Sequence, residues 1–142
     1  MAGLREFGAK MKKHGENVEL NAAHLVRKAA LAVDATVVLA TPVDEGRARG
    51  NWQVALNGPA SGTLEIEDKN GAAAIAQGKA TIPGHKPGGS IHITNNLPYI
   101  GRLNDGWSAQ APAGFVQAAV LQGVAAVRGA QGIVTGRFRD GE

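Results

Sequence analysis

The feature that most constrains this chain is a long segment, residues 17–40, whose apolar side chains recur with the period of an α-helix. Asn17 precedes it as a good N-cap residue. The dipeptide Thr41-Pro42 ends it, because the residue before a proline is pushed out of the helical region. The sequence therefore predicts one long main helix.

The segment before this helix predicts a second, shorter one over residues 4–13. Leu4, Phe7 and Met11 are spaced so that they share one face of such a helix, and basic residues occupy the rest of it. Gly15 is expected to end this short helix, so that two consecutive helices precede the first proline.

The main helix carries two rows of apolar side chains. The wider row is expected to pack on the chain's own sheet, and its members are Val18, Ala22, Leu25, Val26, Ala29, Val33, Val37 and Ala40. A second row, Leu20, Leu31 and Val38, lies on the opposite side. Two interpretations of this row stay open: scattered surface aliphatics, or one patch of an interface between subunits.

The length of 142 residues predicts one domain, residues 1–128, followed by a flexible tail over residues 129–142. Apolar residues make up 44% of the chain, but 25 of them are alanines, so few side chains are large enough to fill a core. The tail is rich in glycine and charge and cannot hold a packed structure alone. We expect a thin core.

Period-two alternation predicts three short strands, at residues 52–56, 64–66 and 91–94. Trp52 is the largest apolar anchor of the first strand. The first two strands are expected to form an antiparallel pair across the turn-rich segment 57–62.

Helical segments surround the predicted third strand. An alanine-rich helix is expected over residues 72–77 with Gly78 at its end, then a mobile loop from Pro83 to Gly89, and a last helix that begins after Pro112 and ends at about Arg128. These elements predict an α+β fold: a long N-terminal helix and a C-terminal helix packed on a small, mainly antiparallel sheet.

Composition excludes several classes of protein. The chain has no cysteine, so disulfides, thiolate metal sites and cysteine nucleophiles are absent. No apolar run approaches the ~18 residues that cross a bilayer, and we expect a soluble, cytosolic chain. The net charge of +3 permits contact with nucleic acid without requiring it.

Signatures of catalysis are missing. No serine lies in a G-x-S-x-G elbow, and no two histidines have the spacing of a helical zinc site. The segment from Gly71 to Lys79 fails as a phosphate loop, because six residues separate its glycines and Ala80 replaces the required hydroxyl. We therefore expect no enzyme, cofactor or metal.

Two weaker alternatives stay open. His85 and His92 with the acidic segment 65–68 are candidate ligands for a metal-dependent hydrolase, although exposed histidines and a solvated strand edge explain them more simply. Basic residues of the first two helices favour instead a small DNA-binding or packaging accessory protein.

Three stretches of the sequence together resemble the minor tail-component family of lambdoid tailed phages and prophages. They are Thr41-Pro-Val-Asp-Glu-Gly-Arg-Ala-Arg-Gly-Asn-Trp52, Ile93-Thr-Asn-Asn-Leu-Pro-Tyr99 and Leu103-Asn-Asp-Gly-Trp-Ser-Ala-Gln-Ala-Pro-Ala-Gly-Phe115. The resemblance spans residues 4–128. Two departures from the family pattern are Glu45, where the family has Thr, and Asn104-Asp105, where it has Glu and an aromatic residue.

The resemblance implies a structural virion protein of the phage neck or tail, made in the host cytoplasm and built into the virion. Its role would be tail completion or head-to-tail joining, as part of a homo-oligomeric ring, a hexamer or dodecamer, around the DNA channel. Its implied partners are the head-tail connector, the tail tube or its terminator, with passing contact to genomic DNA. No catalysis and no membrane contact are implied.

The residues of these stretches have two kinds of expected role. Pro42, Gly46, Trp52 and Tyr99 are predicted to determine the fold, by ending the helix, allowing tight turns and filling the core. The others are predicted either to support the fold or to form an interface: Asp44, Arg47, Arg49, Trp107 and Gln110. Together with Leu20, Leu31 and Val38 of the second row, they are the candidate site residues.

Overall fold

The computed structural model describes residues 2–129. In chain order its elements are α1 (Ala2–Ala40), α2 (Arg47–Gly50), β1 (Trp52–Leu56), α3 (Ala72–Thr81), the 3-10 helix η1 (Ile82–Gly84), β2 (Ile91–Asn95), α4 (Ile100–Asn104) and α5 (Phe115–Gly129). The predicted α+β class, with long N-terminal and C-terminal helices and a small antiparallel sheet, is confirmed. The predicted tail falls, from residue 130 on, outside the described residues.

The first helix is continuous, so the prediction of two helices is wrong. Gly15 and Asn17 both lie inside α1, which runs for 39 residues. A glycine within a helix costs only about 1 kcal/mol and does not end it when the neighbouring residues favour helix. Thr41-Pro42 does end it, as predicted.

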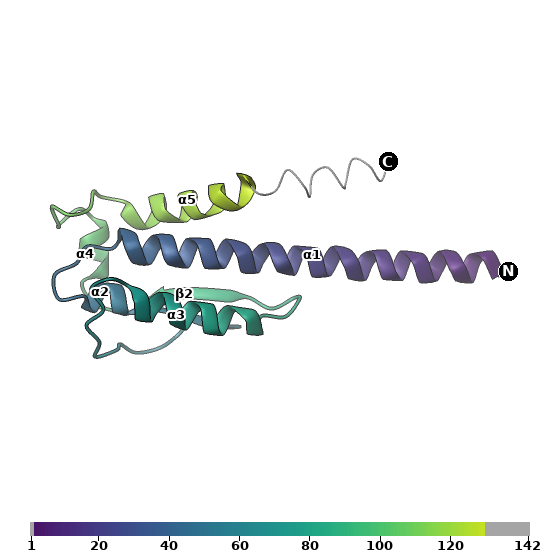
Figure 1. Ribbon diagram of the computed structural model, residues 1–142, viewed down its shortest axis with the longest axis horizontal. Coiled ribbons are helices and arrows are strands. Elements are labelled where there is room, and N and C mark those ends of the chain that lie inside the picture. Colours follow the sequence, from purple (N-terminus) through teal and green to yellow (C-terminus); the bar gives the residue numbers. More distant parts are fainter. Residues whose placement is uncertain (1, 130–142) are drawn as a thin grey trace.

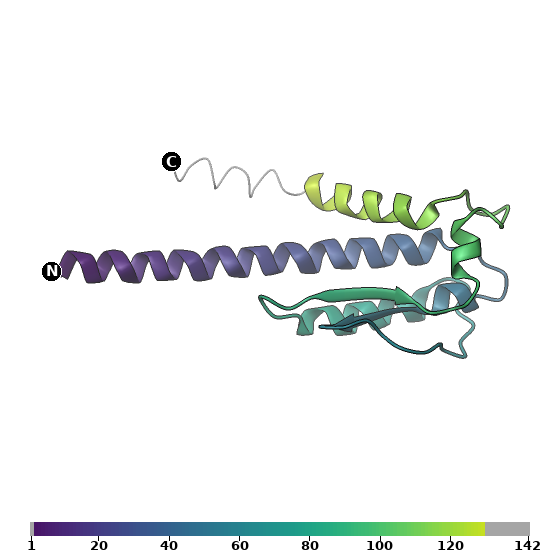
Figure 2. The same ribbon diagram turned by 180° about the vertical axis from the view of Figure 1, so that it is seen from behind.

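The molecule has three layers around the C-terminal half of α1. α5 lies along one side of α1, and the sheet with α3 lies along the other (Figure 1). Figure 2 shows from behind that α4 and its flanking loops connect the two outer layers at the end of α1. The N-terminal half of α1 extends beyond both layers, and every residue from 3 to 22 is exposed.

Glycines set the distance of the outer layers from α1. Gly123 of α5 packs against Val33 so closely that an added Cβ would lie 2.7 Å from the Cα of Val33. On the opposite side Gly71, with φ +76°, packs against Val38 in the same way. Val33 of the wider apolar row therefore packs on α5 rather than on the sheet as predicted, Val18, Ala22 and Val26 of that row are exposed, and Val38 of the second row belongs to the core.

The sheet has two strands instead of the predicted three. β1 and β2 pair antiparallel in the register Trp52 to Asn95 and Leu56 to Ile91. Residues 64–66 form no strand because the buried Asn51 side chain takes their hydrogen bonds: its amide nitrogen donates to Leu64 O at 3.0 Å, and its oxygen accepts from Leu64 N at 2.6 Å. The Asn51 side chain thus bonds the backbone N and O of Leu64, which the predicted strand would have paired with a neighbouring strand.

α3 continues through Gly78 to Thr81, so the predicted end at Gly78 is wrong. Gly78 is instead a contact residue, because a Cβ there would collide with the carboxylate of Asp34 on α1. The loop after α3, predicted to be mobile, is held to α1, since Arg27 donates to His85 O at 2.6 Å. His85 is itself buried and its Nε2 lies 2.9 Å from Gly89 O.

The core is thin, as predicted. Its buried cluster consists of Val37, Val38, Trp52, Ala74 and Ala119. Trp52 is the largest of these side chains and is buried to 7% exposure, which confirms it as the anchor of β1. With so few large side chains in the core, polar contacts between elements contribute a large share of the fold's specificity.

The burial of the Asp34 carboxyl leads us to expect an unusual dependence of stability on pH. It is 2% exposed, its Oδ1 has no hydrogen-bond partner, and burial raises its pKa from 3.8 to about 7. Because the folded state holds the proton more tightly, the contribution of neutral Asp34 is complete below pH 4 and is lost as the pH rises toward 7. The rise of the Asp34 pKa from 3.8 to about 7 corresponds to a decrease in the free energy of unfolding on the order of 4 kcal/mol above pH 7.

We expect Asp34→Asn to increase the free energy of unfolding at pH 8 and to change it little at pH 4, because the amide is neutral at both values. Urea denaturation followed by circular dichroism at several pH values measures this. A matched control is Asp44→Asn, at an exposed carboxylate. Equal effects of Asp34→Asn at pH 4 and pH 8 would contradict the prediction.

Candidate functional site

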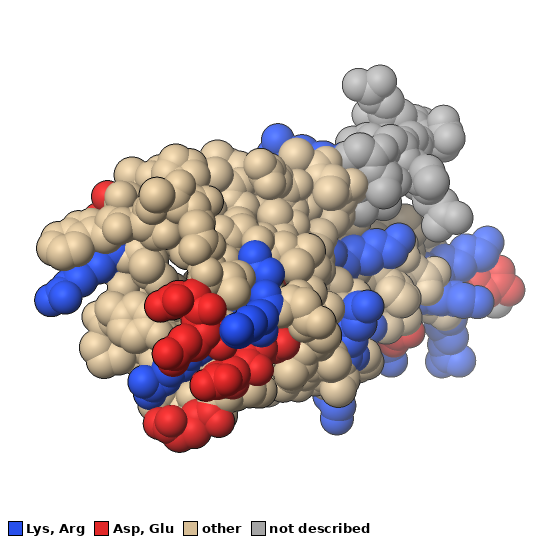
Figure 3. Space-filling model, turned by 60° about the vertical axis from the view of Figure 1, so that its left-hand side comes forward, with Lys and Arg blue, Asp and Glu red and all other residues tan. Residues whose placement is uncertain are grey.

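The three stretches that carry the family resemblance meet at one end of the molecule. They are the α1–α2 loop with α2, the residues around Tyr99 that lead into α4, and the α4–α5 loop. We call this the motif end; it lies opposite the free N-terminal half of α1 (Figure 1), and Figure 3 brings it forward.

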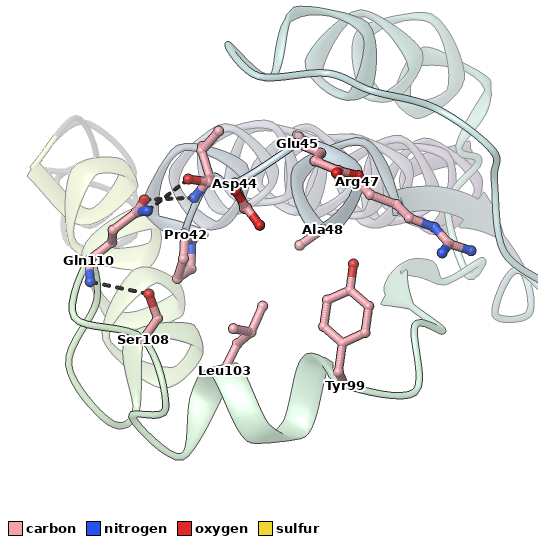
Figure 4. Close-up of a pocket in the computed structure, with 11 residues that line it drawn as sticks. Pro42, Asp44, Glu45, Arg47, Ala48, Tyr99, Leu103, Ser108 and Gln110 are labelled. Carbon is pink, nitrogen blue, oxygen red and sulfur yellow. Dashed lines mark hydrogen bonds between the residues drawn. The ribbon is translucent and has the colours of Figure 1, made fainter.

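A pocket of about 290 Å³ lies between these stretches. Its lining consists of residues 42–48, Tyr99 and Leu103 from the start and interior of α4, and Ser108 and Gln110 from the α4–α5 loop. Figure 4 shows Leu103 and Tyr99 pointing into it from one side, toward Pro42 and Ala48 on the other. The pocket therefore combines the apolar side chains of Pro42 and Leu103 with polar groups, among them the Tyr99 hydroxyl.

Gln110 fixes the two loops that border the pocket. Its amide nitrogen donates to Val43 O, and its oxygen accepts from Val43 N, both at 2.8 Å (Figure 4). Gly46 completes the turn with φ +85° and packs on the backbone of residues 68–69, where any Cβ would collide. Pro42, Gly46 and Gln110 thus act as determinants of the fold at the pocket.

Arg49 holds the end of α1. Its guanidinium donates to Leu39 O at 2.8 Å and to Thr41 O at 3.1 Å, which are carbonyls left without partners at a helix C-terminus. Its third contact, to Lys69 O at 2.8 Å, joins the loop before α3 to the same point. All three contacts of the Arg49 guanidinium are within this chain, so Arg49 stabilises the fold.

Acidic side chains surround the pocket. Asp44 and Glu45 are exposed on its rim, and Glu65 and Glu67 lie exposed on the neighbouring loop. Arg47, which also lines the pocket, pairs with Glu65 at 3.3 Å. Figure 3 shows the acidic side chains gathered into one patch on this end. We call the four carboxylates the acidic patch.

Trp107 is the most exposed large apolar side chain of the described residues, at 74%. It lies in the α4–α5 loop, with the Arg102 guanidinium 5.4 Å from its ring centre. Asn104, the last residue of α4, satisfies a free backbone N–H in the first turn of α5, since its side-chain oxygen accepts from Val116 N at 3.0 Å. Tyr99 is half-buried and lines the pocket, so it contributes less to the core than predicted.

A second surface lies at the other end of the molecule, on the part of α1 that extends beyond the other elements. We call residues 3–22 the arm. Leu4, Phe7 and Met11 are 69%, 62% and 54% exposed, and they form one face of the arm with Val18. The interface prediction for the second row is wrong for Val38, which is buried in the core; Leu31 is half-buried, and Leu20 is exposed on the arm.

The candidate metal ligands do not come together. His85 is buried against Gly89, His92 lies 2.9 Å from Ser90 Oγ, and Asp68 accepts from Ala74 N at 2.9 Å to begin α3. Within residues 2–129 no three His, Asp or Glu side chains are grouped so that they could hold a metal ion. No helix in the same part of the chain is long and apolar enough to cross a membrane.

The chain matches no family model, no curated protein and no solved structure.

Sequence analysis missed four polar residues that position the motif end and the sheet. Asn51, Gln77, Asn104 and Asp68 each satisfy backbone groups of a distant or following segment. Gln77 bonds both N and O of Val54, at 2.9 and 2.8 Å, and so covers the free edge of β1. Only Asp68 lies shortly before a helix, α3, so only this residue could have been signalled by its position as a capping residue.

We expect Arg49→Ala to lower the free energy of unfolding by about 2–4 kcal/mol, because several charge-assisted hydrogen bonds to otherwise orphaned carbonyls are lost. Arg47→Ala is the matched control, since it removes one exposed ion pair worth less than about 1 kcal/mol. Urea denaturation measures both. Equal losses for the two variants would contradict the role assigned to Arg49.

Proposed function

We propose that this chain is a structural virion protein of a phage neck or tail, which acts in tail completion or head-tail joining as one subunit of an oligomeric ring around the DNA channel. Its function is assembly rather than catalysis. Its proposed partners are further copies of itself and the neighbouring neck and tail proteins: the connector, the tail tube or its terminator.

The observation that carries this proposal is the arm. A helix of about 20 residues without tertiary contacts is marginal in water, because helix nucleation is costly and packing supplies most helical stability. The arm nevertheless presents a continuous apolar face, Leu4, Phe7 and Met11, to solvent. A face of this kind is typical of a surface that becomes buried when a protein assembles.

The motif end supports the same proposal. Many of the residues on which the family resemblance rests gather around one pocket, while others, such as Trp52, lie in the core. Trp107, one of these residues, is exposed, as expected of a residue that anchors an interface. α5 adds exposed apolar residues on its outer side, Val120, Leu121 and Val124. The chain thus offers apolar surface on several sides, as a subunit in a crowded ring requires.

The test is electron microscopy of particles from a phage whose copy of this gene is stopped early. We expect filled heads separate from unjoined or aberrant tails, and restored virions when the intact gene is supplied in trans. A phage with synonymous changes at the same codon is the control. Normal infectious virions from the stopped gene would overturn the proposal.

A second candidate function, a small DNA-binding or packaging accessory protein, is favoured by the basic residues of the arm, Arg5, Lys10, Lys12 and Lys13, which are all exposed. Four phosphate contacts predict an affinity for duplex DNA that falls with salt at a logarithmic slope of about −3.6. Mobility shift of a DNA duplex at increasing salt measures this. Absence of retention at low ionic strength removes this candidate.

A further inference from the structure

The arm and the motif end lie at opposite ends of an elongated molecule (Figure 1). α1 has 39 residues, which at 1.5 Å per residue is about 58 Å. The tip of the arm, residues 3–13, is separated from the motif end by most of this length. Because α1 is one continuous helix, the tip cannot fold back onto the motif end of its own chain. Any contact between these two surfaces joins different molecules.

The two surfaces are complementary in charge. The tip carries four basic residues, Arg5, Lys10, Lys12 and Lys13, and one acidic residue, Glu6. The motif end carries the acidic patch, of which Asp44 and Glu45 stand on the pocket rim and only Glu65 is paired. Figure 3 shows acidic side chains gathered on the near end and mainly basic ones on the receding part of α1.

The two surfaces are also complementary in their apolar parts. At 100° per residue Leu4, Phe7 and Met11 fall within about 60° of one another, with Lys10 and Lys12 on either flank. The pocket offers matching groups: its lining includes Pro42, Leu103 and the ring of Tyr99, and the carboxylates of Asp44 and Glu45 lie among them. Its volume of about 290 Å³ exceeds that of several water molecules, at about 30 Å³ each, and has room for an aromatic side chain.

We infer that the tip of the arm docks on the motif end of a second copy of this chain, with Phe7 or Leu4 at the pocket and Lys10 and Lys12 against Asp44 and Glu45. Trp107, exposed beside the pocket, covers the rest of the apolar face. The contact joins two different patches head to tail, an interface that forms a ring when the rotation from one subunit to the next closes and an open filament when it does not. This inference rests on the proposed function only in that the contact would build the ring. The contact itself depends only on the two surfaces.

Pairing of two arms with each other is less well supported. Leu4, Met11 and Val18 recur every seven residues, but of the intervening positions 7, 14 and 21 only Phe7 is apolar; the others are His14 and Asn21. A stable two-stranded coiled coil needs apolar residues at both positions of each heptad. Parallel arms would in addition bring their basic tips together.

Charge reversal tests the contact with the full chain. The arm variant carries Lys10→Glu and Lys12→Glu, and the end variant carries Asp44→Lys and Glu45→Lys. The control variant carries Lys79→Glu and Lys86→Glu, which lower the net charge as much as the arm variant does, at exposed positions away from both surfaces. Sedimentation at increasing protein and salt concentrations measures self-association, and circular dichroism checks that each variant is folded.

We expect the wild type and the control to associate, and added salt to weaken the association. Each single-surface variant alone should associate at least about tenfold more weakly, because like charges then face each other. Mixing the two variants should restore association with the two variants in alternation, since the basic arm of one meets the acidic end of the other and the reversed arm meets the reversed end. A chain with all four reversals should associate again, because its charges are complementary once more.

A covalent test uses the absence of native cysteine. Met11→Cys in one copy and Ser108→Cys in another should form a disulfide between the two chains, whereas Ala76→Cys, on the exposed face of α3, should not react with Met11→Cys. Self-association of the end variant at wild-type strength would overturn the inference and indicate pairing between arms. A wild type that stays monomeric up to about 1 mM and forms no such disulfide would also overturn it.

The two proposals fail separately. A missing contact, together with broken virions from the stopped gene, would remove this interface and leave the neck function. A contact that forms in solution, together with normal virions from the stopped gene, would remove the neck function and leave a self-assembling protein.

Discussion

The fold depends on how the C-terminus of α1 is satisfied. Thr41 Oγ1 donates to Val37 O at 2.6 Å and accepts from Trp52 Nε1 at 2.8 Å, so a helix end and the start of β1 share one buried hydroxyl. The Arg49 guanidinium donates to the carbonyls of Leu39 and Thr41. The loop that contains Pro42 is therefore preceded by a helix end that side chains of other elements hold by hydrogen bonds. The pocket can keep its shape in a protein with a thin core because Pro42, which lines it, directly follows this hydrogen-bonded end of α1.

α1 acts as a rod against which the other elements pack through glycines. Gly71 and Gly78 approach it from the α3 side, and Gly123 approaches it from the α5 side. A glycine contact fixes distance and register at once, because no other residue fits there. It also explains how a chain with 25 alanines can fold, since close approach of backbones replaces the interdigitation of large side chains.

The sequence predicted the fold class, the end of α1 at Thr41 and the anchor Trp52, because proline chemistry and apolar period act locally. It did not predict that Val38 is buried, because both sides of α1 are covered and helical period alone does not say which row meets which layer. The strand expected at residues 64–66 failed because the distant Asn51 takes its hydrogen bonds. The sequence indicated which three stretches contain the pocket residues. It did not predict that these stretches meet, because the resemblance names residues and gives no positions in space.

The continuity of α1 connects the two ends of the molecule physically. A break at Gly15 would have let the tip pivot, and the basic and apolar residues around Phe7 would then have had no fixed direction. In one helix these residues keep a constant rotation relative to the layers that hold the motif end, because each residue advances about 100° around the axis. A rod with a basic apolar tip and an acidic pocket at its far end has a polarity. Head-to-tail assembly requires such a polarity, because one surface of each subunit binds the other, different surface of the next subunit.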